Sequence, residues 1–158
     1  MPSLAGALEA PSTEDRVKTA IAFKITRFVS WPTPVDKIKL CVLGEDEFIK
    51  TLKTMTGKVS RGREIEVVEQ KSPAQYAGQC QMLFLDNTEK STTQQILNDL
   101  RGKPVLTISD DDGFVEKGGI IGLFRDQNKI RIAINLKSSK EAGLAISAPL
   151  LDLAKIVQ

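Results

Sequence analysis

Histidine is absent from this sequence of 158 residues. Because histidine is the commonest general base and a frequent zinc ligand, its absence removes Ser-His-Asp catalysis and histidine-based zinc sites from consideration. The chain also lacks the nucleotide-binding patterns GxGxxG and GxxxxGK[ST] and the hydrolase motif GxSxG. We therefore expect a protein that is not an enzyme and that has no cofactor and no bound metal.

A strong excess of charge and a long apolar run are missing as well. The 22 basic and 20 acidic residues give a net charge of only +2, and aromatic residues make up 5% of the chain. No basic block is interleaved with aromatics, so nucleic acid is not an expected partner. No apolar run reaches the roughly 20 residues that span a bilayer. We expect no direct membrane insertion, and contact with a membrane only through another protein.

The length fits one domain, which we place at residues 12–158. Residues 1–11 are expected to form a flexible N-terminal segment. Within it, Ala5, Gly6 and Ala7 fit a signal cleavage site, but the charged and apolar parts of a signal peptide are missing. These residues can equally be left from cloning or belong to a mobile mature terminus.

Apolar periodicity predicts an amphipathic first helix over residues 12–30. Ser12 and Asp15 fit a capping pair at its start, and Trp31 and Pro32 end it. The apolar residues at helical spacing are Val17, Ala20, Ile21, Ile25 and Phe28.

Strands and helices then alternate, which is typical of a mainly parallel sheet. Strands are predicted at residues 37–43, 65–68, 82–85 and 104–108, with helices at 45–55 and 95–100. Two apolar runs flank Asp126, Gln127 and Asn128 as in an antiparallel hairpin, and a helix is expected to close the chain. The predicted fold is α/β: a three-layer Rossmann-like sandwich with about five to six strands, helices on both faces and a C-terminal hairpin.

Acidic residues follow three of the predicted strands and should meet at the carboxyl edge of the sheet. One hypothesis is a receiver-like phosphoacceptor, in which Asp86 is the nucleophile and Glu45 and Asp46 hold Mg²⁺. Gly44 interrupts the expected run into the acidic pair, and acidic residues in turns are usually turn formers or helix-dipole partners. We therefore favour a structural role. The remaining members of the set are Asp110, Asp111 and Asp112.

Basic residues Lys58, Arg61 and Arg63 surround two glycines before the second strand. They could hold an anion, but a solvated surface loop is the favoured interpretation.

Several motifs, in this order and spacing, resemble those of the YfiR family over about residues 21–157. They are FVSWP at 28–32, KLCVLGEDEF at 39–48, GKVSRGREIEV at 57–67, VLTISDDDGF at 105–114, GGIIG at 118–122 and INLKSSKEAGLAIS at 134–147. Each motif is weak alone, and the ordered set is specific.

The resemblance implies a periplasmic protein that inhibits an inner-membrane diguanylate cyclase by binding its periplasmic sensor domain, which lowers cyclic di-GMP. An outer-membrane lipoprotein that captures the inhibitor is a further implied partner, and a homodimer is compatible with the family. The alternative is a small-molecule-sensing receptor domain for a membrane kinase.

Two cysteines, Cys41 and Cys80, complete the expected features. In a 2-1-3-4 strand order the first strand lies beside the third, so the pair can be bridged or can remain as buried thiols. A bridge would contribute on the order of 4 kcal/mol in the chain-entropy model. The resemblance implies the bridge; a second pair that some members carry, in the segment matching residues 115–122, has no counterpart here.

Candidate partner-binding residues are Trp31, Leu144, Ile146 and Leu151. Aromatic residues are enriched in interface hot spots, which favours Trp31. Against this stands a purely structural interpretation, in which Trp31 covers a helix end and the C-terminal leucines pack on the sheet.

Overall fold

The computed structural model describes residues 12–70 and 79–158. The predictions for residues 1–11, including the cleavage site at Ala5 to Ala7, lie outside this part. The helices are α2 (Thr13–Thr26), α3 (Asp46–Leu52), the short η1 (Lys53–Met55), α4 (Lys90–Asp99), α5 (Leu136–Glu141) and α6 (Ala148–Asp152). The strands are β1 (Val29–Ser30), β2 (Lys37–Leu43), β3 (Val59–Ser60), β4 (Arg63–Glu69), β5 (Met82–Leu85), β6 (Leu106–Ser109), β7 (Ile121–Asp126), β8 (Lys129–Asn135), β9 (Ala145–Ile146) and β10 (Lys155–Val157).

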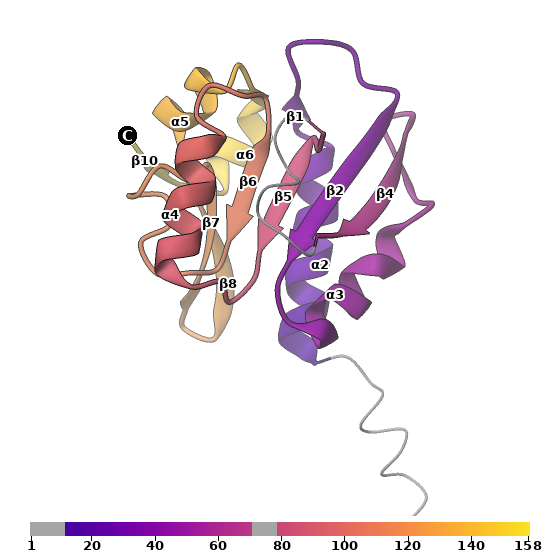
Figure 1. Cartoon of the computed structure of the whole chain (residues 1–158), viewed down its shortest axis with the longest axis horizontal. Coiled ribbons are helices and arrows are strands. Elements are labelled where there is room, and N and C mark those ends of the chain that lie inside the picture. The colour runs from indigo at the N-terminus through magenta and orange to yellow at the C-terminus, as the bar shows by residue number, and fades with distance from the viewer. Residues whose placement is uncertain (1–11, 71–78) are drawn as a thin grey trace, which may run out of the picture.

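Eight strands form one sheet in the order β10-β8-β7-β6-β5-β2-β4-β3 (Figure 1). All neighbours run parallel except the pairs β3–β4 and β7–β8. The central order β4-β2-β5-β6 is the predicted 2-1-3-4 arrangement, and the mainly parallel α/β class is confirmed. The sheet has more strands than predicted, because β3 and β10 have only two and three residues and carry no readable alternation.

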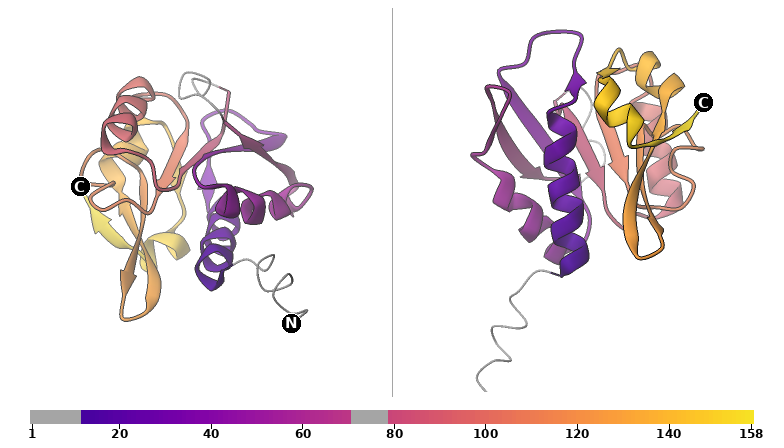
Figure 2. Two further views of the ribbon diagram at one scale, coloured as in Figure 1. Left: turned by 60° about the horizontal axis from the view of Figure 1, so that its bottom comes forward. Right: turned by 180° about the vertical axis from the view of Figure 1, so that it is seen from behind.

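Side chains alternate between the two faces of the sheet, as β2 shows. Leu40 and Val42 join a core covered by α2, α3 and α6, whereas Cys41 joins a second core under α4. Figure 2 shows α2 and α6 on the same side of the sheet. Within the described residues, no helix combines the length and the apolar character required to cross a bilayer.

The first helix is shorter than predicted and turns a different face to the core. It ends at Thr26, and Val29 and Ser30 form β1 instead. Val17, which the periodicity placed on the apolar face, is 38% exposed, whereas Lys18 is only 4% exposed. The cap is confirmed, because the Asp15 amide donates to Ser12 Oγ at 3.0 Å.

The predicted C-terminal hairpin is confirmed, but the prediction that a helix closes the chain is wrong. Gln127 and Asn128 form the turn between β7 and β8 with φ angles of 52° and 66°, as a two-residue hairpin turn requires. Helix α6 ends at Asp152, and β10 then pairs in parallel with β8. The predicted helix does not continue because residues 155–157 form backbone hydrogen bonds with β8, a distant segment that the apolar spacing does not reveal.

Candidate functional site

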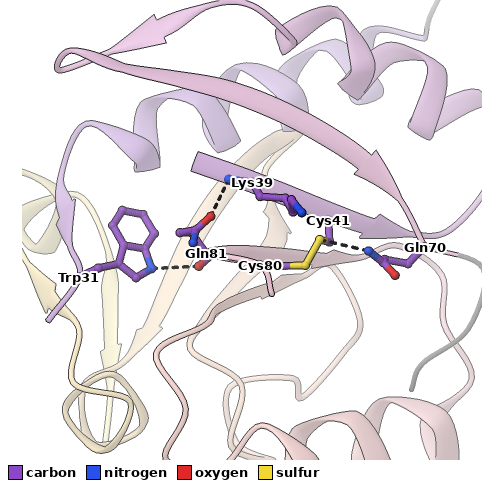
Figure 3. Close-up of a disulfide and its surroundings, with 6 residues drawn as sticks. All are labelled: Trp31, Lys39, Cys41, Gln70, Cys80 and Gln81. Atoms are coloured by element: carbon purple, nitrogen blue, oxygen red, sulfur yellow. Dashed lines mark hydrogen bonds between the residues drawn. A yellow bond between two sulfur atoms is a disulfide. The ribbon is translucent and has the colours of Figure 1, made fainter. Parts of the chain in front are cut away.

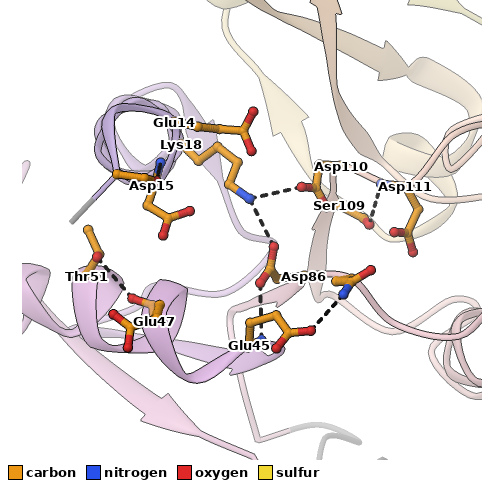
Figure 4. A network of polar contacts seen from close by, with 12 residues as sticks. Glu14, Asp15, Lys18, Glu45, Glu47, Thr51, Asp86, Ser109, Asp110 and Asp111 are labelled. Atoms are coloured by element: carbon orange, nitrogen blue, oxygen red, sulfur yellow. Dashed lines mark hydrogen bonds and ion pairs between the residues drawn. The ribbon is translucent and has the colours of Figure 1, made fainter. Parts of the chain in front are cut away.

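The carboxyl edge of the sheet contains a buried cation held between two carboxylates. Lys18 Nζ from α2 lies 3.0 Å from Asp86 Oδ1 and 2.9 Å from Asp110 Oδ2 (Figure 4). Asp86 follows β5 and Asp110 follows β6, which are adjacent parallel strands. The strand order therefore brings the two carboxylates together, and α2 supplies the opposite charge. We call these three residues the Lys18 network.

Burial and ion pairing act in opposite directions on Lys18. Burial disfavours its charged form, but the hydrogen bonds and charges of Asp110 and Asp86 outweigh that effect, so its pKa lies above the ordinary value of 10.5. The ammonium also lies 4.5 Å from the centre of the Phe48 ring, a cation–π contact. Lys18 is therefore charged at neutral pH.

Asp86 is the most enclosed carboxylate of the network, with a side chain only 6% exposed. Burial raises its pKa, and the bond and charge of Lys18 and the amide of Glu45 only partly offset this. Gly44 passes so close that a Cβ there would lie 2.5 Å from Asp86 Cβ, which explains the glycine at the position that interrupts the acidic pattern.

A pocket of about 420 Å³ opens outward from the Lys18 network. Burial and the neighbouring charge of Asp110 raise the pKa of Asp111 at its rim. Of the predicted acidic set, Asp46 and Asp112 do not line this pocket. Its acidic lining residues are Glu14, Asp15, Glu45, Glu47, Asp86, Asp110 and Asp111.

The network disfavours the receiver-like hypothesis on geometric grounds. A phosphoacceptor must present a carboxylate oxygen to the phosphodonor beside Mg²⁺. In Asp86, Oδ1 is bonded to Lys18 and Oδ2 accepts from the Glu45 amide at 3.2 Å. Both oxygens are thus engaged inside the protein, and among residues 12–70 and 79–158 no group of three His, Cys, Asp or Glu side chains is arranged to hold a metal. The arrangement is suited to anchoring α2 on the sheet.

A disulfide joins Cys41 and Cys80, whose Cα atoms are 6.0 Å apart (Figure 3). Cys41 lies in β2, and Cys80 lies just before β5, its neighbour in the sheet. Gln70 at the end of β4 donates through Nε2 to Cys41 Sγ at 3.3 Å. Of the two possibilities that the sequence left open, the structure has the bridge rather than two thiols.

Trp31 is half-buried and held at several points. Its Nε1 donates to the Gln81 carbonyl at 3.0 Å, and the Arg63 guanidinium lies 5.4 Å from its ring centre (Figure 3 shows the first contact). Arg63 also donates to the Thr26 carbonyl at 2.7 Å, and Arg61 donates to the Arg27 carbonyl at 3.3 Å. Arg61 and Arg63 therefore bind the carbonyl end of α2, a role that no local pattern in the sequence predicts.

Of the other three candidate residues, Leu144 directly precedes β9, Ile146 lies in β9 and Leu151 lies in α6. Ile146 of β9 lies opposite Val29, so this segment reaches the chain just before Trp31. Leu144 is only 4% exposed and belongs to the core, which leaves it no surface for a partner. Ile146 and Leu151 are partly buried, like Trp31. We refer to these remaining candidates, Trp31 after β1, Ile146 in β9 and Leu151 in α6, together as the β1–β9 surface.

Comparison with known proteins identifies a family and a fold. A family model described as YfiR/HmsC-like matches residues 15–155. A solved structure of a conserved domain protein from Vibrio cholerae is 13% identical with a TM-score of 0.61, and the match covers 91% of this chain and 60% of that one. An ABC domain from Streptococcus pneumoniae, in complex with L-Trp, is 16% identical with a TM-score of 0.61, with coverage of 85% and 60%. This chain thus spans about 60% of each structure, and such identities show similarity of fold alone.

Proposed function

Because the chain belongs to the YfiR/HmsC-like family, whose model matches residues 15–155, we propose that it inhibits a membrane diguanylate cyclase by binding its periplasmic sensor domain. Members of this family are periplasmic regulators of diguanylate cyclase signalling. The match over nearly the whole domain is the observation that carries the proposal. Capture of the inhibitor by an outer-membrane lipoprotein and formation of a homodimer are further parts of it.

The arrangement of charged groups supports binding rather than catalysis. Lys18, Asp86 and Asp110 satisfy one another at the carboxyl edge, where open α/β sheets usually place their reactive groups. A regulator of this kind needs instead a surface with anchor residues that a partner can bury. The β1–β9 surface offers an aromatic ring and two aliphatic side chains. Each is already partly packed against the core, so it would lose little conformational entropy when a partner binds.

The β1–β9 surface is our proposed contact with the cyclase. Ile146→Asp places a charge on this surface, and Val59→Asp is the control for a charge added elsewhere, because Val59 is 59% exposed on β3, an edge strand of the main sheet. Circular dichroism checks that both variants are folded. Tagged wild-type protein, Ile146→Asp and Val59→Asp are used to capture partners from native cell envelopes by crosslinking. We expect a diguanylate cyclase with the wild type and with Val59→Asp, and at least tenfold less with Ile146→Asp.

Cellular cyclic di-GMP provides the second measurement. Ile146→Asp should raise it relative to the wild type, and Val59→Asp should not. Recovery of soluble metabolic proteins without any membrane signalling enzyme would contradict the cyclase proposal. Equal capture by all three proteins, with unchanged folding, would leave the cyclase and reject this surface.

A small-molecule receptor for a membrane kinase is the second candidate. A hollow of about 150 Å³ beside Trp31 is lined in part by Val35, Cys80 and Val105. The pneumococcal domain of similar fold was solved in complex with L-Trp, which makes L-Trp the first compound to test. A receptor should show a saturable rise in melting temperature, because a ligand that binds only the folded state stabilises it by mass action. No rise with L-Trp or related amino acids would disfavour this function.

A further inference from the structure

A further cavity, of about 210 Å³, lies at the amino edge of the sheet. Three segments meet there: residues 101–105 before β6, residues 117–120 before β7, and α5, which follows β8. Because β8 runs antiparallel to β7, its last residues reach the same edge at which β6 and β7 begin. Figure 1 shows α5 beside the end of α4 in this part of the molecule. We call this hollow the amino-edge cavity.

Positive charge is concentrated around the amino-edge cavity. Its lining includes four cationic residues, Arg101, Lys103, Lys117 and Lys137, and a single acidic residue, Glu141. The whole chain has a net charge of only +2, so this local excess is a property of the fold. Four cations gathered from three segments repel one another, and such an arrangement is stable at little cost only when an anion or solvent screens it.

None of the four cationic side chains is neutralised by the described part of the protein. The ion pairs among residues 12–70 and 79–158 use Lys18, Lys53, Arg125 and Arg131 as their cations. Arg101, Lys117 and Lys137 are exposed and Lys103 is half-buried, so their charged groups can reach a ligand from solvent. Among the described residues, the cavity therefore has four cationic side chains without an ion-pair partner, against one acidic side chain.

The rest of the lining suits a small bound anion. Buried apolar residues, including Leu100, Val105 and Ile120, form part of the wall. A wall of low dielectric focuses the field of the cations and strengthens their bonds to an anion. Ser138 adds a hydroxyl donor beside Lys137. The volume is below the roughly 300 Å³ at which drug-sized ligand sites begin, which favours a compact ligand.

We propose that the amino-edge cavity binds a small anion through a phosphate or carboxylate group. Arg101 is suited to two parallel hydrogen bonds with such a planar or tetrahedral oxyanion, and the lysines supply point charges around it. The amino-edge cavity shares the wall residue Val105 with the hollow beside Trp31. Anion binding there does not depend on which protein the regulator binds. It would make the stability of the domain depend on a small solute of its compartment.

The test is a titration of the full chain with inorganic phosphate, and in a parallel arm with citrate, at constant ionic strength set with sodium chloride. We expect a saturable rise in melting temperature with at least one of the two anions. The double variant Arg101→Gln/Lys137→Gln should bind that anion at least tenfold more weakly, since each charged hydrogen bond contributes about a factor of ten or more. Lys50→Gln, an exposed lysine of α3, is the matched control and should bind like the wild type.

Three outcomes would overturn the proposal. The first is a response to both anions that does not saturate or that equals the response to chloride. The second is equal affinity in the wild type and the double variant, with both shown to be folded by circular dichroism. The third concerns the source of the oxyanion: retention by vesicles containing phosphatidylglycerol, without any effect of phosphate or citrate, would assign the basic residues to a lipid surface instead of a free small anion.

Discussion

At the carboxyl edge of the sheet, Lys18 is buried between Asp86 and Asp110, whereas at the amino edge four cationic residues line a cavity and form no ion pair within the described residues. Opposite charges that are buried together hold elements of the fold in place, and their removal affects folding. Like charges left at a cavity contribute little to folding and remain free for a ligand. The carboxyl edge thus holds charges that stabilise the fold, and the amino edge holds charges that we propose bind an anion.

The largest expected effect comes from Lys18→Met. Removing the ammonium leaves two carboxylates, one of them almost fully buried, without their cation. Breaking a buried ion pair in this way costs about 3 to 5 kcal/mol, so the free energy of unfolding should fall by roughly that amount. Urea denaturation measures it, with Lys50→Met as the exposed control. A loss below about 1 kcal/mol would mean that the network contributes no more than a surface pair.

Gly44→Ala should act on the same network by steric means. The added Cβ would lie 2.5 Å from Asp86 Cβ and 2.8 Å from the Asp86 carbonyl oxygen, which is backbone and cannot move freely. We expect a destabilisation of about 1 to 3 kcal/mol, the usual cost of overpacking. If urea denaturation shows no change, the approach of residue 44 to Asp86 is not as tight as described.

Asp111→Asn should stabilise the protein slightly at neutral pH. Burial and the charge of Asp110 raise the pKa of Asp111, so the folded state favours its protonated form. The stabilisation from this group is therefore complete below the pKa of the unfolded state and is lost as pH rises through the pKa of the folded state. At pH 7 the wild type bears the cost of the ionised form, and the variant should gain less than about 1 kcal/mol, since the group is partly solvated. The gain should vanish as pH falls toward about 4. A gain that persists there would point to a cause other than charge.

The smallest effect is expected for Lys137→Gln at the amino edge. Its charge has no partner among the described residues, so the free energy of unfolding without added anion should change by less than about 0.5 kcal/mol. Lys18→Met and Lys137→Gln each remove one lysine charge, so the difference between their losses of unfolding free energy directly compares the two edges. A loss above about 1 kcal/mol would show that Lys137 supports the fold.

Much of the fold could be predicted from local patterns. The unbroken apolar runs of β2 and β5 gave their bounds, and the alternation of strands with helices gave the parallel order that brings Cys41 beside Cys80. The strands of two or three residues could not be predicted, because β1, β9 and β10 form through pairing with distant segments. For the same reason, the sequence predicts a closing helix that is longer than α6: pairing with β8 makes residues 155–157 a strand.

The candidate sites were less predictable. The sequence placed Asp86 and Asp110 at the carboxyl edge but did not provide their partner, because periodicity counts apolar residues and overlooks a buried lysine. The spacing of Lys18 to Ala22 and Ile25 was the one available signal, since these residues share a helical face. The amino-edge cavity had no signal at all, because its cations lie in three separate segments.

The sequence by itself determined the α/β class, the family resemblance and the exclusion of histidine chemistry, because these depend on local patterns and on which residue types are present. Only the tertiary structure decided which charges meet. It placed Lys18 between Asp86 and Asp110 at the carboxyl edge, and at the opposite edge it gathered four cations that form no ion pair with the described residues. Coulomb interactions depend on distance through space, and no spacing along the chain records that distance.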